Sequence, residues 1–271
     1  SGSPNFGNST STRIDKRGDL INKIYLKIKI SNVNPNGNSF AWVKRLGHAI
    51  IKNLQIEMGG TVYDRQNGTW LDIWYELARQ GDIDVKNKKM IGDIPELTDY
   101  NNKIKPSYTM YIPLQFWFNK FVGLSIPIIA LQYHDLVINV EFERLCKLIC
   151  HSKNFDPDSD KIEITNASFL INYIYLDTEE RTKFAQCCHE YLIEQVQNND
   201  KQTISSDYIS RLNFNYVVKE IYWIARNQNY ISNQQFLYYS SNFENTATFT
   251  NAANNILLAS VFVGNEKPSI Y

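Results

Sequence analysis

Alternation of apolar and polar side chains is the feature of this sequence that most restricts its fold. In the stretch 20–30, four aliphatic residues are expected to point one way and three lysines and a tyrosine the other way: Ile24, Leu26, Ile28 and Ile30 against Lys23, Tyr25, Lys27 and Lys29. A period of two residues is that of a β-strand with one buried face and one face in water. The same pattern predicts strands at 50–58, 61–64, 108–118, 136–142, 162–176, 216–225 and 255–263. The chain is therefore predicted to consist mainly of β-strands.

Short helices and turns interrupt this pattern. Apolar residues at helical spacing predict a helix over 70–79, capped by Asn67 or Thr69, and a second helix over 177–197, capped by Asp177 or Thr178. The first helix is expected to bury Trp70, Ile73, Trp74, Leu77 and Ala78, and the second Phe184, Cys188, Tyr191, Leu192 and Val196. Gly59 and Gly60 predict a hairpin turn. The polar stretch 80–105 is expected to be a long loop, and 122–132 a short helix or an irregular turn.

The order of these elements indicates a fold class. Strands with short helices are followed by a segment rich in Asp at 153–161, which is the best candidate for a linker, and then by strands and one helix again. This order differs from the regular strand–helix alternation of a parallel α/β sheet. The sequence therefore predicts an all-β fold that is repeated once, with two consecutive antiparallel β-sandwiches of jelly-roll pattern and short inserted helices.

Composition excludes several classes of protein. Lysine and arginine together number 28, and aspartate and glutamate together also number 28, so the chain lacks the basic excess of a dedicated nucleic-acid binder. No apolar run reaches the roughly 18 residues of a membrane span. There is no glycine-rich phosphate loop and no nucleophile elbow. The four histidines are scattered, which argues against a cupin-type metal enzyme.

A few residues remain as candidates for chemistry. His134 precedes Asp135 and could form a carboxylate–imidazole pair, although a histidine at a strand end is the favoured interpretation. Cys146, Cys150 and His151, with Cys187, Cys188 and His189, could form a metal site, but neither cysteine pair has zinc-site spacing, and core packing explains Cys188. Reduced thiols are expected. Asn8, Asn67 and Asn166 begin glycosylation sequons whose use the sequence leaves open. No catalytic, cofactor-binding or metal-binding residue is assigned.

Two surface features are candidates for contact. The aromatic cluster Phe116-Trp117-Phe118 could form a sugar-stacking platform, but the period of two places Phe116 and Phe118 inside and only Trp117 outside, which favours core packing with one surface ring. The lysines Lys23, Lys27 and Lys29 could meet phosphate or an acidic partner, although a solvated strand face is the favoured interpretation. Trp117 and Tyr25 are candidate interface anchors, and the polar stretches 80–105 and 197–211 are candidate contact loops.

Several strings of this sequence resemble the major capsid proteins of nucleocytoplasmic large DNA viruses (iridovirus, phycodnavirus and mimivirus-like). The resemblance to the first jelly roll of that family lies in the strings 1–8, 40–43, 46–50, 70–77, 112–118 and 127–134. The strings 175–181, 184–185 and 189–195 resemble the opening of its second jelly roll.

The resemblance implies a double jelly roll, expected to be incomplete at both ends, with a first jelly roll over 1–143 lacking its first strand, a linker over 144–161 and a second jelly roll over 162–271. It implies a structural protein without catalytic residues or cofactors. Three copies would form a homotrimeric pseudo-hexagonal capsomer in an icosahedral shell, the outer capsid of a virion assembled in the host cytoplasm. The implied partners are the chain itself, neighbouring capsomers, minor capsid proteins and proteins of an internal virion membrane, with no direct contact to nucleic acid and no small-molecule substrate.

Two other functions share this fold. One is a minor capsid protein or a jelly-roll virion protein that binds a glycan or a receptor, for which glycan affinity and an aromatic-lined pocket are expected. The other is the cupin-type enzyme that the scattered histidines disfavour.

Overall fold

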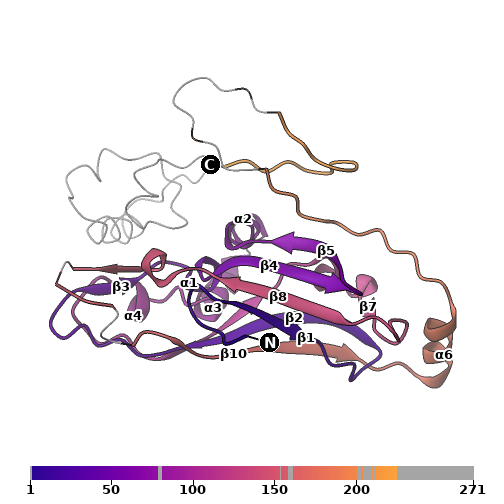
Figure 1. Cartoon of the computed structure of the whole chain (residues 1–271), viewed down its shortest axis with the longest axis horizontal. Coiled ribbons are helices and arrows are strands. Elements are labelled where there is room, and N and C mark those ends of the chain that lie inside the picture. Colours follow the sequence, from indigo (N-terminus) through magenta and orange to yellow (C-terminus); the bar gives the residue numbers. More distant parts are fainter. Residues whose placement is uncertain are drawn as a thin grey trace.

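The fold is a sandwich of two antiparallel sheets (Figure 1). The computed structural model describes residues 2–78, 81–152, 154–157, 161–199, 203, 209 and 211–224. The first sheet has the strand order β1 (Ser9–Arg13), β8 (Leu136–Phe142), β4 (Ile51–Met58), β5 (Thr61–Gln66). The second has the order β10 (Ile164–Ile174), β2 (Leu20–Ile30), β6 (Tyr108–Pro113), with β7 (Ile126–Pro127) also paired to β2. A small third sheet joins β3 (Phe40–Trp42) to β9 (Ile149–His151).

The strand β2 confirms the predicted alternation. Its residues Ile24, Leu26, Ile28 and Ile30 are buried, whereas Lys23 and Lys29 are exposed. Inward-facing residues of both sheets, such as Ile28 of β2 and Ile138 of β8, belong to one hydrophobic cluster. Burial of a large aliphatic side chain contributes about 1.5–3 kcal/mol, so this shared layer holds the two sheets together.

The predicted hairpin joins β4 to β5. Gly59 and Gly60 have φ angles of 58° and 85°, and two adjacent positive φ angles are those of a type I′ turn. A side chain at Gly59 would place its Cβ 2.6 Å from Nδ1 of His134. Glycine is therefore required there both by the backbone conformation and by the histidine packed against the turn.

The strand predicted at 108–118 is shorter than expected. It ends at Pro113, and the short helix α5 (Trp117–Lys120) follows. Leaving the sheet breaks the period of two, so Trp117 is only 4% exposed and packs edge-on against Phe118, with ring centroids 5.2 Å apart. The prediction that Trp117 lies outside as an interface anchor is wrong.

Helices occupy part of the predicted loop 80–105. After α1 (Leu46–Ala49) and α2 (Gly68–Ala78), the chain forms α3 (Gly81–Met90) and α4 (Pro95–Thr98). The sequence of α3 is predominantly polar, so it gave no apolar periodicity to recognise. The predicted helix at 70–79 is confirmed as α2, but its expected buried stripe is wrong: Leu71 and Asp72 are buried, whereas Leu77 is 60% exposed.

The second predicted helix is also shorter than expected. The helix α6 (Thr178–Gln186) has the predicted cap, because Oδ1 of Asp177 accepts a hydrogen bond from the Glu180 N–H at 2.8 Å. It ends at Gln186 and buries no residue, so no apolar stripe forms and Cys188 is exposed. The short helix or irregular turn expected at 122–132 is confirmed by the 3₁₀ helix η1 (Val122–Leu124) and by β7, and another 3₁₀ helix, η2, spans Leu145–Lys147.

The strand predicted at 162–176 is confirmed as β10, which pairs antiparallel with β2 and so joins the sheet of β2 and β6. Residues 216–224 carry no strand, contrary to the prediction, and the strand predicted at 255–263 lies outside the described residues. The division of the chain into a first jelly roll ending at 143 and a second beginning at 162 stays a prediction. In the structure, β10 from the predicted second jelly roll pairs with β2 from the predicted first one. No helix in the described ranges is long and apolar enough to cross a membrane.

Candidate assembly surfaces

The residues singled out for chemistry lie apart from one another. The carboxylate of Asp135 pairs with Arg13, with Oδ1 and Nη2 2.7 Å apart, and His134 packs on the turn at Gly59. Asp135 immediately precedes β8. Both members of the Asp135–Arg13 pair are well exposed. This arrangement supports the interpretation of His134 as a histidine near a strand end.

The four cysteines are free thiols. Cys150 is buried in β9, and this burial raises the pKa of its thiol to about 12. The other three thiols are exposed: Cys146, Cys187 and Cys188. Within the described part of the chain, no three His, Cys, Asp or Glu side chains cluster as metal ligands would.

The three sequon asparagines differ in their surroundings. Oδ1 of Asn67 accepts a hydrogen bond from the Trp70 N–H at 2.8 Å, so this side chain is the predicted N-cap of α2. Asn8 and Asn166 are exposed, the latter on β10. Asn67 therefore has a structural role, whereas Asn8 and Asn166 are open to solvent.

A buried ion-pair cluster holds α2 against α1, and the sequence analysis missed it. Arg45, in the left-handed conformation just before α1, donates to Oδ1 of Asp72 at 2.7 Å and also pairs with Glu76. Asp72 is fully buried, and its Oδ1 lies 3.5 Å from Nδ1 of His48. Burial disfavours the charge of Arg45, but the carboxylates of Asp72 and Glu76 outweigh this effect and raise the pKa of Arg45 above its ordinary value. Asp72 and Glu76 are spaced i, i+4 on one helix, but their partner lies 27 positions before Asp72, which hides the cluster from local patterns.

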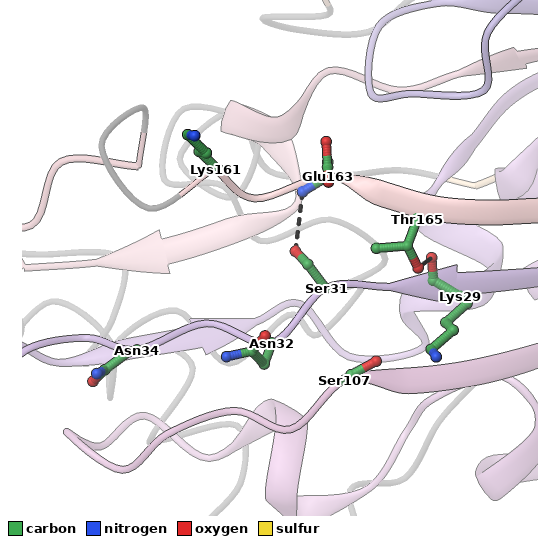
Figure 2. Close-up of a pocket in the computed structure, with 8 residues that line it drawn as sticks. All are labelled: Lys29, Ser31, Asn32, Asn34, Ser107, Lys161, Glu163 and Thr165. Atoms are coloured by element: carbon green, nitrogen blue, oxygen red, sulfur yellow. Dashed lines mark hydrogen bonds between the residues drawn. The ribbon is translucent and has the colours of Figure 1, made fainter.

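A polar cavity of about 430 Å³ lies at one end of the second sheet (Figure 2). It is lined by side chains from β2 and β10, from the segment after β2, and from the segments entering β6 and β10: Lys29, Ser31, Asn32, Asn34, Ser107, Lys161, Glu163 and Thr165. The lining contains two lysines and one carboxylate, so the cavity favours a polar or anionic occupant.

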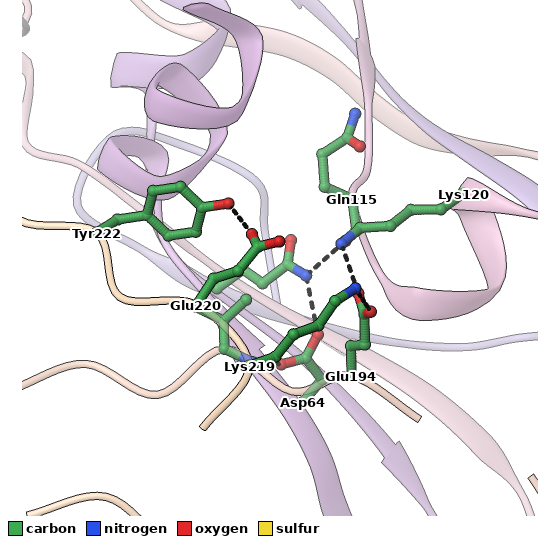
Figure 3. Close-up of polar contacts among 9 residues, drawn as sticks. Asp64, Gln115, Lys120, Glu194, Lys219, Glu220 and Tyr222 are labelled. Carbon is green, nitrogen blue, oxygen red and sulfur yellow. Dashed lines mark hydrogen bonds and ion pairs between the residues drawn. The ribbon is translucent and has the colours of Figure 1, made fainter. Parts of the chain in front are cut away.

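Beyond α6, the described residues 187–199 and 211–224 form an extended arm without helix or strand. Figure 3 shows the polar contacts where this arm meets β5 and α5. The Val196 N–H donates to Oδ1 of Asp64 at 3.0 Å, and Glu194 lies between two lysines, with Nζ of Lys120 at 3.3 Å and Lys219 on the arm itself. The ring of Tyr222 lies 5.3 Å from that of Trp70 on α2. The arm is thus attached to the first sheet and to α2.

Asp64 is the buried acceptor in this attachment. Burial raises the pKa of its carboxyl, and this is partly offset by the hydrogen bonds that it accepts from the N–H groups of Val196 and Arg65 and the amide of Gln66. A buried carboxylate needs such donors, and the arm supplies one of them to Asp64 through the Val196 N–H.

The arm also presents large apolar side chains to solvent. Val217 is 98% exposed, and several further side chains of the arm are largely exposed: Leu192, Tyr216 and Trp223. A row of exposed apolar groups is typical of a surface that another polypeptide covers. Tyr216, Val217 and Trp223 lie in the stretch 216–225 that was predicted to be a strand, and Leu192 was predicted to lie on the buried stripe of a helix.

A sandwich of two antiparallel sheets with short inserted helices fits the class of jelly-roll proteins. A family model described as "Major capsid protein N-terminus" matches residues 1–177, and one described as "Large eukaryotic DNA virus major capsid protein" matches residues 180–267. The chain belongs to this family of major capsid proteins of large eukaryotic DNA viruses, as the sequence resemblance had indicated.

Individual relatives agree with this assignment. Capsid protein 1 of Acanthamoeba polyphaga mimivirus is 39% identical over 276 residues, covering 95% of this chain and 46% of the relative. The major capsid protein of Pyramimonas orientalis virus is 38% identical, covering 83% of this chain and 54% of the relative. A chain of the solved PBCV-1 virus capsid is similar with a TM-score of 0.60 at 31% identity, and the match covers 72% of this chain and 44% of the capsid chain. The predicted all-β, double jelly-roll fold class agrees with this similarity. The chain spans about half the length of the curated relatives it matches.

Proposed function

We propose that this chain acts as a structural major capsid protein, three copies of which form a pseudo-hexagonal capsomer in an icosahedral virion shell. The proposal rests mainly on the two capsid family models, which match residues 1–177 and 180–267. The similarity of the sandwich to a chain of a solved virus capsid supports it further. Its role is mechanical, and the residues that matter are those of packing and contact.

The surfaces of the chain suit repeated self-contact. Equal numbers of acidic and basic residues let many copies pack without strong mutual repulsion. The exposed apolar groups of the arm supply anchors of the kind that dominate interfaces, such as Trp223 and Tyr216. These residues replace Trp117 as candidate anchors, because Trp117 lies in the core. Tyr25, half-buried on β2, remains a candidate.

We place the protein in the outer shell of the virion, after assembly in the host cytoplasm. Its partners would be further copies of itself, neighbouring capsomers, minor capsid proteins and proteins of an internal virion membrane. Support comes from the relatives, whose names are those of capsid proteins. The proposed division into jelly rolls over 1–143 and 162–271 has to be weighed against the β2–β10 pairing and against the two family models, which meet between 177 and 180 and favour a later boundary.

The test is native mass by light scattering, together with electron microscopy, on the complete gene product that contains this chain. A threefold mass with hexagonal outlines is the expected result. Replacing Val217 and Trp223 by serine is expected to reduce trimer formation, whereas the control Val122→Ser in η1, also an exposed valine, should leave it unchanged. A stable monomer at all concentrations would contradict the capsomer and favour a minor or glycan-binding virion protein.

A further inference from the structure

The outward face of the second sheet is basic and carries aromatic rings. The register places Tyr111, Lys27 and Ser168 in one row across β6, β2 and β10, and Thr109, Lys29 and Asn166 in the next row. A third row holds Pro113, Tyr25 and Leu170, and Lys23 lies further along β2 on the same side. We call this surface the lysine face; none of its named residues is a carboxylate.

The lysines of this face are not neutralised within the described residues. Several other lysines of the chain pair with a carboxylate: Lys52, Lys88, Lys120, Lys147 and Lys219. In the part of the chain that the structure describes, Lys23, Lys27 and Lys29 make no such pair. Because the net charge of the whole chain is zero, this local excess of positive charge is a feature of one face rather than of the composition.

The lysine face continues into the 430 Å³ polar cavity, since Lys29 belongs to both (Figure 2). The hydroxyl of Ser31 accepts a hydrogen bond from the Glu163 N–H at 3.1 Å, so its own proton is left to donate to a ligand. The exposed amide of Asn32 supplies both donors and an acceptor. The cavity can therefore bind hydroxyl groups as well as an oxyanion.

We propose that the lysine face and this cavity bind an acidic oligosaccharide. Its anionic groups would lie at Lys27 and Lys29, which stand about 7 Å apart as alternate residues of one strand, and its hydroxyl groups would lie in the cavity. Tyr25 and Tyr111 supply flat amphipathic rings beside the lysines, with Nζ of Lys27 lying 5.8 Å from the centre of the Tyr111 ring.

A saccharide fits this surface better than a nucleic acid does. A nucleic-acid site combines a basic groove with aromatic side chains on which successive bases stack. Here the two tyrosines lie on the sheet, whereas the cavity is lined by hydroxyl, amide, ammonium and carboxylate groups and has no ring on which a base could stack. A neutral chain also lacks the overall basic charge typical of nucleic-acid binding. The inference stands independently of the proposed shell function, because it uses only this face and its cavity.

Binding of the 271-residue chain to a sulfated heparin oligosaccharide tests the proposal. The same oligosaccharide after desulfation and a single-stranded oligonucleotide of equal charge serve as comparison probes. The sulfated probe is expected to bind at least tenfold more tightly than either comparison probe, and its affinity should fall as salt rises.

Variants locate the site. Lys27→Gln combined with Lys29→Gln is expected to weaken binding of the sulfated probe at least tenfold. The matched control, Lys86→Gln with Lys103→Gln, removes two exposed lysines elsewhere and should change binding less than twofold. Asn32→Ala is expected to weaken binding of the oligosaccharide but not of inorganic sulfate, because it removes a contact to the sugar. Urea unfolding of each variant checks that the fold is retained.

Three results would overturn the proposal. The first is no binding of the sulfated probe, the second is equal loss in the control variant, and the third is tighter binding of the oligonucleotide. The last result would reassign the lysine face to nucleic acid.

Discussion

Removal of one partner from the buried Arg45–Asp72 pair is expected to destabilise the sandwich strongly. Asp72 is fully buried, and its Oδ1 accepts from Arg45 at 2.7 Å. The variant Arg45→Met leaves this carboxylate with only the His48 ring nitrogen, 3.5 Å away, as its nearest remaining partner. An uncompensated buried charge of this kind lowers the free energy of unfolding by about 3–5 kcal/mol.

Removing Asp72 is not expected to lower the free energy of unfolding by the same amount as removing Arg45. In Asp72→Leu, Arg45 keeps its contact with Glu76, and its side chain remains 19% exposed to water. We therefore expect a smaller loss, about 3 kcal/mol, at the lower end of the range for a broken buried pair. The double variant Arg45→Met with Asp72→Leu buries two apolar side chains in place of the ions and is expected to lose less than about 2 kcal/mol. The effects should thus be clearly non-additive, as in other pairs in direct contact.

Urea unfolding, followed by tryptophan fluorescence, measures these differences. The matched control is Arg13→Met with Asp135→Leu, singly and together, because that pair has the same 2.7 Å separation but lies at the surface. Each single change there is expected to cost at most about 1 kcal/mol. Additive losses at Arg45 and Asp72, or single losses no larger than those of the surface pair, would refute the reasoning.

Three further predictions test other parts of the structure. In the native protein a thiol reagent should modify three cysteines rapidly, whereas the thiol of Cys150, whose pKa burial raises to about 12, should react only on unfolding; rapid reaction of all four would contradict this. Because burial raises the pKa of Asp64, its contribution to stability is fully present below the unfolded pKa of about 3.9 and is lost as the pH rises through the folded pKa. Urea titrations between about pH 4 and about pH 7 should therefore show a smaller fall in unfolding free energy for Asp64→Asn than for the unsubstituted chain. An equal fall in both proteins would show that Asp64 does not contribute to the pH dependence of stability. Ile28→Ala should cost about 2–5 kcal/mol, because Ile28 is fully buried between the sheets; Leu170→Ala, at a half-exposed site on β10, should cost much less, and similar losses at the two positions would argue against this placement of the core.

Sequence patterns correctly predicted those features that are determined by residues close together in the chain. The alternation over 20–30 predicted β2 with its bounds, and the Gly59-Gly60 pair predicted the hairpin. Asn67 and Asp177 were each one of two residues predicted as the cap of a helix. Each of these features depends on residues within a few positions of one another. The resemblance to the capsid family likewise rested on continuous strings, and the family models confirm it.

Other features are invisible to such patterns. The burial of Trp117 follows from the departure of the chain from the sheet after Pro113, which the continuing apolar period concealed. The helix predicted to reach 197 stops at Gln186, because its apolar residues lie along an extended arm, where Val196 donates to Asp64 instead of continuing a helix. Here tertiary contacts outweigh intrinsic helix preference, which is a weak determinant.

The sequence by itself therefore determined the all-β class, most strand positions, the hairpin turn and the family. The tertiary structure decided which strands pair, so that β10 lies beside β2, and which polar residues meet, as Arg45 and Asp72 do. The physical reason is the range of the interaction. Backbone conformation and side-chain alternation are set by neighbours in the chain, whereas strand pairing and ion pairing join residues that become neighbours only when the whole sandwich forms.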